Sequence, residues 1–334
     1  MNARAAVAAM TAYTLELHEA EIKLNQNESP YDFPLKAEIL ASLASQPWNR
    51  YPDFESSTLR NALATAYGFK PENILVGNGS NELLAAAIGA FVGPGTPVVF
   101  PRPTFALYEK LVTIAGGLPI AIDFDSSTGF LPLDAMLREL APGAVAIVCS
   151  PNNPTGSVLP PGGLKSLLAT GATVLFDRAY GDFALDELPP LDDRLVTFST
   201  FSKAWGLAAL RVGWLASTAA TCREIRKVKL PYSLNTLSEA IAALALQQRS
   251  IRDANVARTI AERERMLARM RANPAIDVFP TRANFIAFRT HATFDYFFEH
   301  GILIRKTVLD GVLRVSVGAR DENDRFLAAL ESLT

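Results

Sequence analysis

The chain of 334 residues is long enough for two domains, and its 49% hydrophobic and 20% charged residues are typical of a globular protein. A formal net charge of −2 excludes the basic surface expected of a protein that binds nucleic acid or an anionic membrane. Two isolated cysteines and three scattered histidines fit neither a zinc site nor a disulfide framework, and no apolar run reaches membrane-spanning length, so we expect a cytoplasmic protein without a metal.

The N-terminal part predicts short elements joined by loops. Residues 1–12 are expected to form a helix or a loose arm, and residues 22–31 an extended segment that breaks at Pro30. The spacing of apolar residues predicts a helix over 34–44. A further helix is expected from Ser57, a suitable N-cap residue.

From about residue 70 the pattern alternates between strands and helices. Several of the expected strands are uninterrupted apolar runs, as in a sheet that is covered on both faces. Strands interleaved with helices predict a mainly parallel sheet wrapped by helices. The expected strands are 74–76, 97–100, 118–122, 144–149, 174–177, 195–199 and 211–215.

The pattern changes near Pro231. Two helices are expected over 238–248 and 251–272, followed by strands at 284–288, 302–305 and 313–317 and by helices at 294–300 and from Asp321. This order predicts a smaller α+β domain on a long helical connection.

The stretch 198–214 contains the most reactive candidate, Lys203. An apolar run and the hydroxyls of Ser199, Thr200 and Ser202 precede it, and Arg211 follows. A buried lysine can lose its proton and form an imine with a carbonyl compound, including pyridoxal phosphate. The alternative for this stretch alone is a surface lysine at the end of a strand.

The segment Gly77–Glu82 predicts an anion site. It lacks the third glycine of a dinucleotide-binding fingerprint, because position 82 is glutamate. Gly79, Ser80 and Asn81 instead place backbone N–H groups and a hydroxyl at the start of a helix, where the helix dipole favours a phosphate. A capped helix without a ligand is the alternative.

Two further polar groups follow buried strands. Asn153 lies in the loop Ser-Pro-Asn-Asn-Pro-Thr-Gly and can offer an uncharged N–H donor to a phenolic oxygen, although such loops are also ordinary turns. Asp177 ends a strand, and a buried carboxylate requires a cationic partner such as a protonated pyridine nitrogen. Tyr180 could reach the oxygen of the same ring. A helix cap and a metal ligand are the alternatives for Asp177.

Together, in this order, these motifs resemble the fold-type I pyridoxal-phosphate enzymes of the aminotransferase class I and II superfamily, and among them most closely the histidinol-phosphate aminotransferase family. The similarity spans nearly the whole chain. It implies a large domain with a mainly parallel sheet and a smaller α+β domain. The expected limits are 1–45 for an N-terminal arm and part of the small domain, 46–235 for the large cofactor-binding domain and 236–334 for the small C-terminal domain. The segments most typical of that family are 24–28, 49–53, 227–235, 283–286, 301–305 and 313–318.

The resemblance implies a role for each cofactor residue. Lys203 would bind the cofactor covalently and transfer the proton, Asp177 would pair with the pyridinium nitrogen, and Tyr180 would donate to the ring oxygen. Asn153 would share that oxygen, and Phe105, where the family often has tyrosine, would stack on the ring. The residues that would hold the phosphate are Gly79, Ser80, Asn81, Thr200, Ser202 and Arg211, with Tyr51 from the partner subunit of a homodimer whose active sites lie at the interface.

The resemblance also implies substrate contacts. Arg314 and Arg305 would bind the anionic end of the substrate, with Tyr13 and Asn25 as further contacts. Arg178, which stands where the family commonly has glutamate, is expected to point outward.

The implied activity is pyridoxal 5′-phosphate-dependent transamination of L-histidinol phosphate with 2-oxoglutarate, a step of histidine biosynthesis. An aromatic amino acid aminotransferase is the closest alternative. A threonine-phosphate decarboxylase and a pyridoxal-binding module without catalysis are further alternatives.

Overall fold

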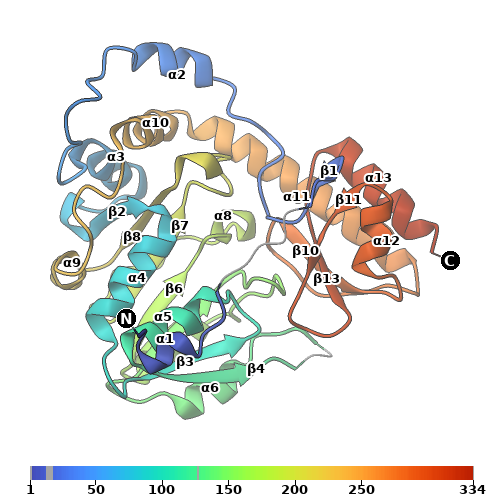
Figure 1. Cartoon of the computed structure of the whole chain (residues 1–334), viewed down its shortest axis with the longest axis horizontal. Coiled ribbons are helices and arrows are strands. Elements are labelled where there is room, and N and C mark those ends of the chain that lie inside the picture. Colours follow the sequence, from blue (N-terminus) through green and yellow to red (C-terminus); the bar gives the residue numbers. More distant parts are fainter. Residues whose placement is uncertain (1, 13–17, 126–127, 334) are drawn as a thin grey trace.

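A seven-stranded sheet forms the centre of the larger part of the molecule (Figure 1). The structure is a computed structural model that describes residues 2–12, 18–125 and 128–333. The strand order is β2-β8-β7-β6-β5-β3-β4, and β8 runs antiparallel to both of its neighbours, whereas β3 to β7 are mutually parallel. The strands are β2 (Ile74–Asn78), β3 (Pro97–Arg102), β4 (Leu118–Asp123), β5 (Val145–Cys149), β6 (Thr173–Asp177), β7 (Leu195–Thr200) and β8 (Val212–Ala216). The predicted mainly parallel sheet is therefore confirmed.

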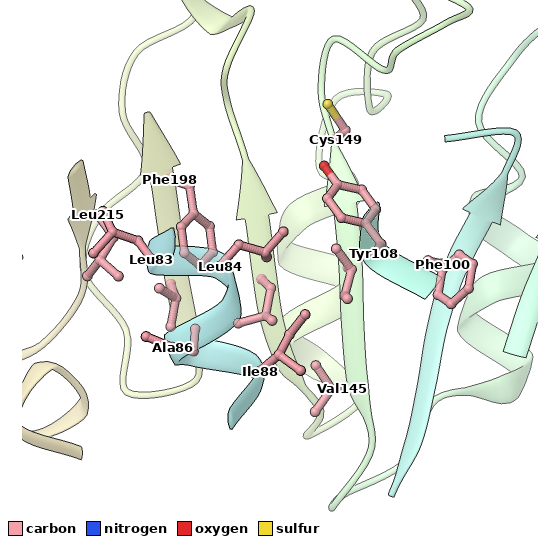
Figure 2. Close-up of a cluster of buried hydrophobic side chains, with 14 of the residues drawn as sticks. Leu83, Leu84, Ala86, Ile88, Phe100, Tyr108, Val145, Cys149, Phe198 and Leu215 are labelled. Carbon is pink, nitrogen blue, oxygen red and sulfur yellow. The ribbon is translucent and has the colours of Figure 1, made fainter. Parts of the chain in front are cut away.

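Helices cover both faces of this sheet. Leu175 of β6 packs into the cluster that contains α4, whereas its neighbours Val174 and Phe176 pack into the cluster on the other face. Figure 2 shows Leu83, Leu84 and other α4 side chains packed against the strands. Because both faces are buried, the strands are continuously apolar. The helices on the first face are α4 (Gly79–Phe91), α5 (Leu107–Ala115) and α9 (Ala219–Arg226), and those on the second are α3 (Ser57–Tyr67), α6 (Leu133–Glu139), α7 (Gly163–Ala169) and α10 (Thr236–Leu246).

The smaller part contains a four-stranded antiparallel sheet in the order β12-β13-β10-β9. A separate strand β1 (Ile22–Lys23) pairs in parallel with β11 (Ile302–Leu303), so the N-terminal segment joins this part of the fold. Ile22 and Leu24 lie in its hydrophobic core. The remaining elements are β9 (Asp277–Val278), β10 (Phe285–Arg289), β12 (Arg305–Lys306), β13 (Val312–Ser316), α11 (Arg249–Ala272), α12 (Phe294–Glu299) and α13 (Arg320–Glu331).

Helix α10 bears on the proposed domain limits. Its side chains Ala242 and Leu246 share a core with Leu59 of α3 and Trp214 of β8. The limit expected at 235/236 would separate α10 from this core, so we propose that the division falls at the start of α11, the long helix that reaches the smaller part in Figure 1.

The short elements are α1 (Ala5–Ala8), α2 (Lys36–Ser42), α8 (Gly181–Ala184) and the 3₁₀ turns η1 (Pro71–Asn73) and η2 (Ala208–Leu210). The predicted N-cap at Ser57 is wrong, because Ser57 is the first helical residue of α3. The Asp53 carboxylate instead accepts the N–H groups of Ser57 at 2.7 Å and Glu55 at 3.0 Å. Among the helices of the described residues, none is both long and apolar enough to cross a membrane.

Candidate active site

The carboxyl ends of β5, β6 and β7 meet at one edge of the large sheet, where Lys203 follows β7. The lysine ammonium donates a hydrogen bond to the Gln26 carbonyl oxygen at 2.8 Å. Burial, together with the positive charges of Arg314 and Arg211 and against the opposing charge of Glu28, lowers the pKa of Lys203 from 10.5 to about 8. A much larger fraction of this amine is neutral, and therefore nucleophilic, at neutral pH than for an exposed lysine.

Asp177 ends β6 as a buried carboxylate. Its Oδ2 accepts a hydrogen bond from the Tyr108 hydroxyl at 2.7 Å, and its Oδ1 accepts one from the Ala179 N–H at 2.8 Å. Burial raises the pKa of Asp177, and these two donors oppose that rise. Within the described ranges, no lysine, arginine or histidine forms an ion pair with it. A buried carboxylate with two donors and no cation has the chemistry to bind a cationic ligand atom.

Tyr108 contacts the Asp177 carboxylate and was not predicted as a site residue from the sequence. It lies on α5, three residues after Phe105, and Figure 2 shows its hydroxyl directed toward Cys149 at the end of β5. Burial raises the pKa of Tyr108 well above its usual value, so the hydroxyl stays protonated and can donate to Asp177. The sequence signal for Tyr108 was its position three residues after Phe105, at the start of a helix. The two rings meet edge-on with centroids 5.7 Å apart.

Arg314 of β13 connects the small sheet to the lysine site through its hydrogen bonds. Its guanidinium donates to the Asn153 side-chain oxygen and, at 2.6 Å, to the Asn25 carbonyl oxygen. The Oδ1 atoms of Asn25 and Asn284 are buried and have no hydrogen-bond partner in the described part of the chain. These two oxygens remain available as acceptors for a ligand that carries N–H or O–H donors.

The side chains of Arg211, Ser202 and Thr200 lie together next to the start of α4, where the sequence predicts an anion site. Arg211 donates to the Ser202 hydroxyl at 3.2 Å, and the Thr200 hydroxyl donates to the same oxygen at 3.0 Å. Gly79 has a φ of 76°, and a Cβ there would lie 2.6 Å from an Arg211 nitrogen. Because only glycine fits, Arg211 can lie against the helix start next to Ser80 and Asn81, where backbone N–H groups favour an anion.

Other predicted residues lie elsewhere. Tyr51 is 82% exposed and stacks on Tyr232 with ring centroids 4.7 Å apart, away from any contact with Lys203. Arg305 lies directly opposite Arg314 in the register of β12 and β13. Tyr13 lies outside the described residues.

The expectation that Arg178 points outward is wrong. Only 7% of Arg178 is exposed, and its guanidinium donates to the Asp186 carbonyl oxygen at 2.6 Å. The residue directly follows Asp177 at the strand end, so its side chain leaves the opposite side of the backbone and is covered by the loop after α8. It lines a separate cavity of about 940 Å³ with Tyr67 and Arg252.

A lysine of lowered pKa, a buried carboxylate with no cationic partner among the described residues and a helix start beside Arg211 are the groups expected in a pyridoxal-phosphate enzyme with the aspartate-aminotransferase-like fold. The chain belongs to the aminotransferase class I and II family, whose model matches residues 19–330. It is 35% identical over 340 residues to a histidinol-phosphate aminotransferase of Chlorobium luteolum, covering 96% of this chain and 94% of that protein.

Solved structures agree with this assignment. The histidinol-phosphate aminotransferase of Sinorhizobium meliloti, in complex with pyridoxal 5′-phosphate, superposes with a TM-score of 0.85 at 25% identity, covering 99% of this chain and 98% of that one. An aspartate aminotransferase variant of Thermus thermophilus gives a TM-score of 0.80 at 20% identity, covering 98% and 99%, which supports the fold. The chain is therefore an aminotransferase that uses pyridoxal phosphate.

The pKa of Lys203 leads to a prediction about cofactor attachment. A neutral amine is required, so the rate at which the cofactor-free protein attaches pyridoxal phosphate should rise with pH and level off above about 8. Stopped-flow absorbance across pH 6 to 10 measures this. A rate that still climbs steeply at pH 10 would mean that Lys203 titrates like an exposed lysine.

Proposed function

We propose that the protein transfers the amino group of L-histidinol phosphate to 2-oxoglutarate, giving imidazole acetol phosphate and glutamate in histidine biosynthesis. The full-length similarity to histidinol-phosphate aminotransferases supports this substrate. The observation that carries the proposal is the pairing of Arg305 with Arg314, because directly opposite residues of antiparallel strands share one face of the sheet. The cytoplasmic location expected from composition belongs to the same proposal.

The roles of the cofactor residues are part of the proposal. Lys203 would hold the cofactor and move the proton between the substrate and cofactor carbons, and Asp177 would keep the pyridine nitrogen protonated, so that the bound ring withdraws electrons. Asn153 and Tyr180 would donate to the ring oxygen, and Phe105 would cover the ring. The cradle of Gly79, Ser80, Asn81, Thr200, Ser202 and Arg211 would bind the phosphate.

The two arginines would recognise the substrate. Arg314 lies against Asn153 and Asn25 at the lysine site and would bind the anionic end of any donor. Arg305 adds a second guanidinium on the same face, and a phosphate dianion can use two guanidinium groups, whereas one carboxylate is satisfied by one. The Oδ1 of Asn25, which has no hydrogen-bond partner among the described residues, would accept a hydrogen bond from the substrate.

Replacing Arg305 with alanine should therefore penalise histidinol phosphate, by roughly 2–5 kcal/mol in transition-state binding, and phenylalanine much less. Arg314→Ala should penalise both donors. The measurement is kcat/KM with each donor and 2-oxoglutarate. Lys306→Ala is the matched control, because it removes an exposed charge from the next residue of β12, on the other face.

The outcomes separate the alternatives. Equal losses for both donors in Arg305→Ala would favour an aromatic amino acid aminotransferase. Carbon dioxide released from threonine phosphate, without amino transfer, would indicate a decarboxylase. A protein that binds the cofactor but turns over none of these substrates would fit a binding module.

A homodimer with Tyr51 in the partner's site is also proposed. Tyr51, Phe54 and Tyr232 form an exposed aromatic cluster, in which Tyr51 stacks on Tyr232 and Phe54 meets Tyr232 edge-on at 5.3 Å. Such a large exposed apolar group is typical of an interface. A second copy of the chain would cover it.

Mixing two inactive variants tests this dimer. In a hybrid of Tyr51→Ala and Lys203→Ala subunits, one site would combine the intact lysine with the intact tyrosine of the other subunit. Activity should recover to about one quarter of wild type after equal mixing and subunit exchange, from random pairing. No recovery, with hybrids verified by mass spectrometry, would place Tyr51 outside the partner's site.

A further inference from the structure

The Tyr180 hydroxyl has a hydrogen-bond donor but no acceptor among the described residues of the protein. The Asn27 side-chain amide donates to its oxygen at 3.1 Å. Among the residues that the structure describes, none accepts the Tyr180 proton, although only 6% of the residue is exposed. A buried hydroxyl normally has its proton paired, so this proton is left for a ligand.

The orientation of the Asn27 amide is fixed by Ser316. The Asn27 backbone N–H donates to the Ser316 hydroxyl oxygen at 2.8 Å, and the Ser316 hydroxyl donates its proton to Asn27 Oδ1 at 3.0 Å. With Oδ1 acting as an acceptor, the amide nitrogen must be the atom that faces Tyr180. A flipped amide would turn its nitrogen toward the Ser316 hydroxyl, which could then no longer donate to it, and would present an acceptor to the tyrosine.

The backbone of Asn27 is held as firmly as its side chain. Its φ is 54°, in the left-handed region that asparagine tolerates better than most residues. The Asn284 amide donates to its carbonyl oxygen at 3.1 Å, and only 1% of Asn27 is exposed. The amide therefore cannot easily move away from Tyr180.

We propose that Asn27, oriented by Ser316, is a positioning residue that keeps the Tyr180 proton available for the ring oxygen of bound pyridoxal phosphate. The three residues come from different parts of the fold, since Asn27 follows β1, Ser316 ends β13 and Tyr180 precedes α8. The smaller part of the molecule thus sets the direction of a donor on the large sheet. This inference rests on the proposed binding of the cofactor at Lys203 and is independent of the amino donor.

The proposed role has a spectroscopic consequence. A donor to the ring oxygen stabilises its ionised form, which lowers the proton affinity of the nitrogen that links Lys203 to the cofactor. The other charged or titratable groups around Tyr180 are Arg314, Asp177, Cys149 and Lys203, whose ammonium lies 5.8 Å from the ring centroid. All of these are unchanged in the variants that test the proposal.

The experiment is a double-mutant cycle on the cofactor-loaded protein without amino donor, read from the pH dependence of the cofactor's visible absorption band. Asn27→Asp replaces the amide donor with an acceptor that takes the Tyr180 proton, so the proton affinity of the chromophore should rise at least about tenfold. Tyr180→Phe should raise it similarly. In the Tyr180→Phe background, Asn27→Asp should raise the proton affinity only by the smaller effect of its charge. The rise caused by Asn27→Asp should therefore be at least about threefold larger with Tyr180 present than with Tyr180→Phe.

Equal shifts from Asn27→Asp in both backgrounds would overturn the proposal, because they would report the new charge alone. Ser316→Ala provides a second, uncharged cycle, which decides the matter if Asn27→Asp fails to fold or to hold the cofactor. It frees the amide to flip and should raise the proton affinity by about twofold or more with Tyr180 present, but not with Tyr180→Phe. If Ser316 only stabilised the fold, Ser316→Ala would lower the thermal stability and leave the titration of the cofactor chromophore unchanged. That result would also overturn the proposal. Absence of the visible band in the wild-type protein would instead refute the proposed cofactor site.

Discussion

Replacing Lys203 with alanine is expected to abolish transamination, with a loss of at least about 10⁴-fold in kcat, because the variant lacks the amine proposed as both the nucleophile and the proton-transfer group. No other described lysine can replace the Lys203 amine. Among the described lysines, only Lys203 is buried next to Arg314 and has a pKa of about 8. Borohydride should fix the cofactor irreversibly onto Lys203 in the wild-type protein and leave the variant unlabelled. Single-turnover kinetics and peptide mapping measure the two effects.

Lys165→Ala is the matched control for this experiment. Lys165 is exposed on α7, which packs on the opposite face of the sheet from α4. Its loss should change neither the labelling nor the turnover. A label mapped to any lysine other than Lys203 would show that the central assignment is wrong.

Much of the large sheet could be predicted because its signal is local. Runs such as Val145–Cys149 and Thr173–Asp177 are apolar on both faces, and the polar residues that follow them mark the edge where ligands bind in parallel sheets. The motif residues Lys203, Asp177, Asn153 and Arg211 could be named for the same reason. Each lies within a short stretch whose composition is unusual for an ordinary turn.

The residues that sequence reasoning missed act through distant contacts. Asn27 and Tyr180 are 153 positions apart, and Tyr108 and Asp177 are 69 positions apart, so nothing in either local stretch indicates the bond between them. The burial of Arg178 was missed for a different reason. The family commonly has glutamate where this chain has Arg178, and the expectation of an outward side chain came from that comparison. Side chains of successive residues after β6 point to opposite sides of the backbone, so the Arg178 side chain lies on the side away from Asp177.

The roles of Tyr108 and Asp177 can be separated by substitution. Tyr108→Phe removes one donor from the Asp177 carboxylate, and hydrogen bonds to charged groups contribute about 1.5–3 kcal/mol. The carboxylate itself remains, and its bond from the Ala179 N–H is unchanged. Tyr108→Phe therefore serves as the matched variant that disturbs the same carboxylate without removing its charge.

Replacing Asp177 with asparagine is expected to lower kcat at least about a thousandfold while weakening cofactor binding by less than about tenfold. The amide keeps the shape of the carboxylate but has no charge, so it cannot hold the pyridine nitrogen in its protonated form, and the ring then withdraws electrons poorly. Cofactor affinity should be retained because Lys203 and the phosphate-binding residues proposed at the start of α4 are unchanged. The measurements are kcat with saturating donor and the dissociation constant of the cofactor, by fluorescence. Tyr108→Phe should fall between wild type and Asp177→Asn in kcat. Turnover of Asp177→Asn near the wild-type value would remove Asp177 from the site.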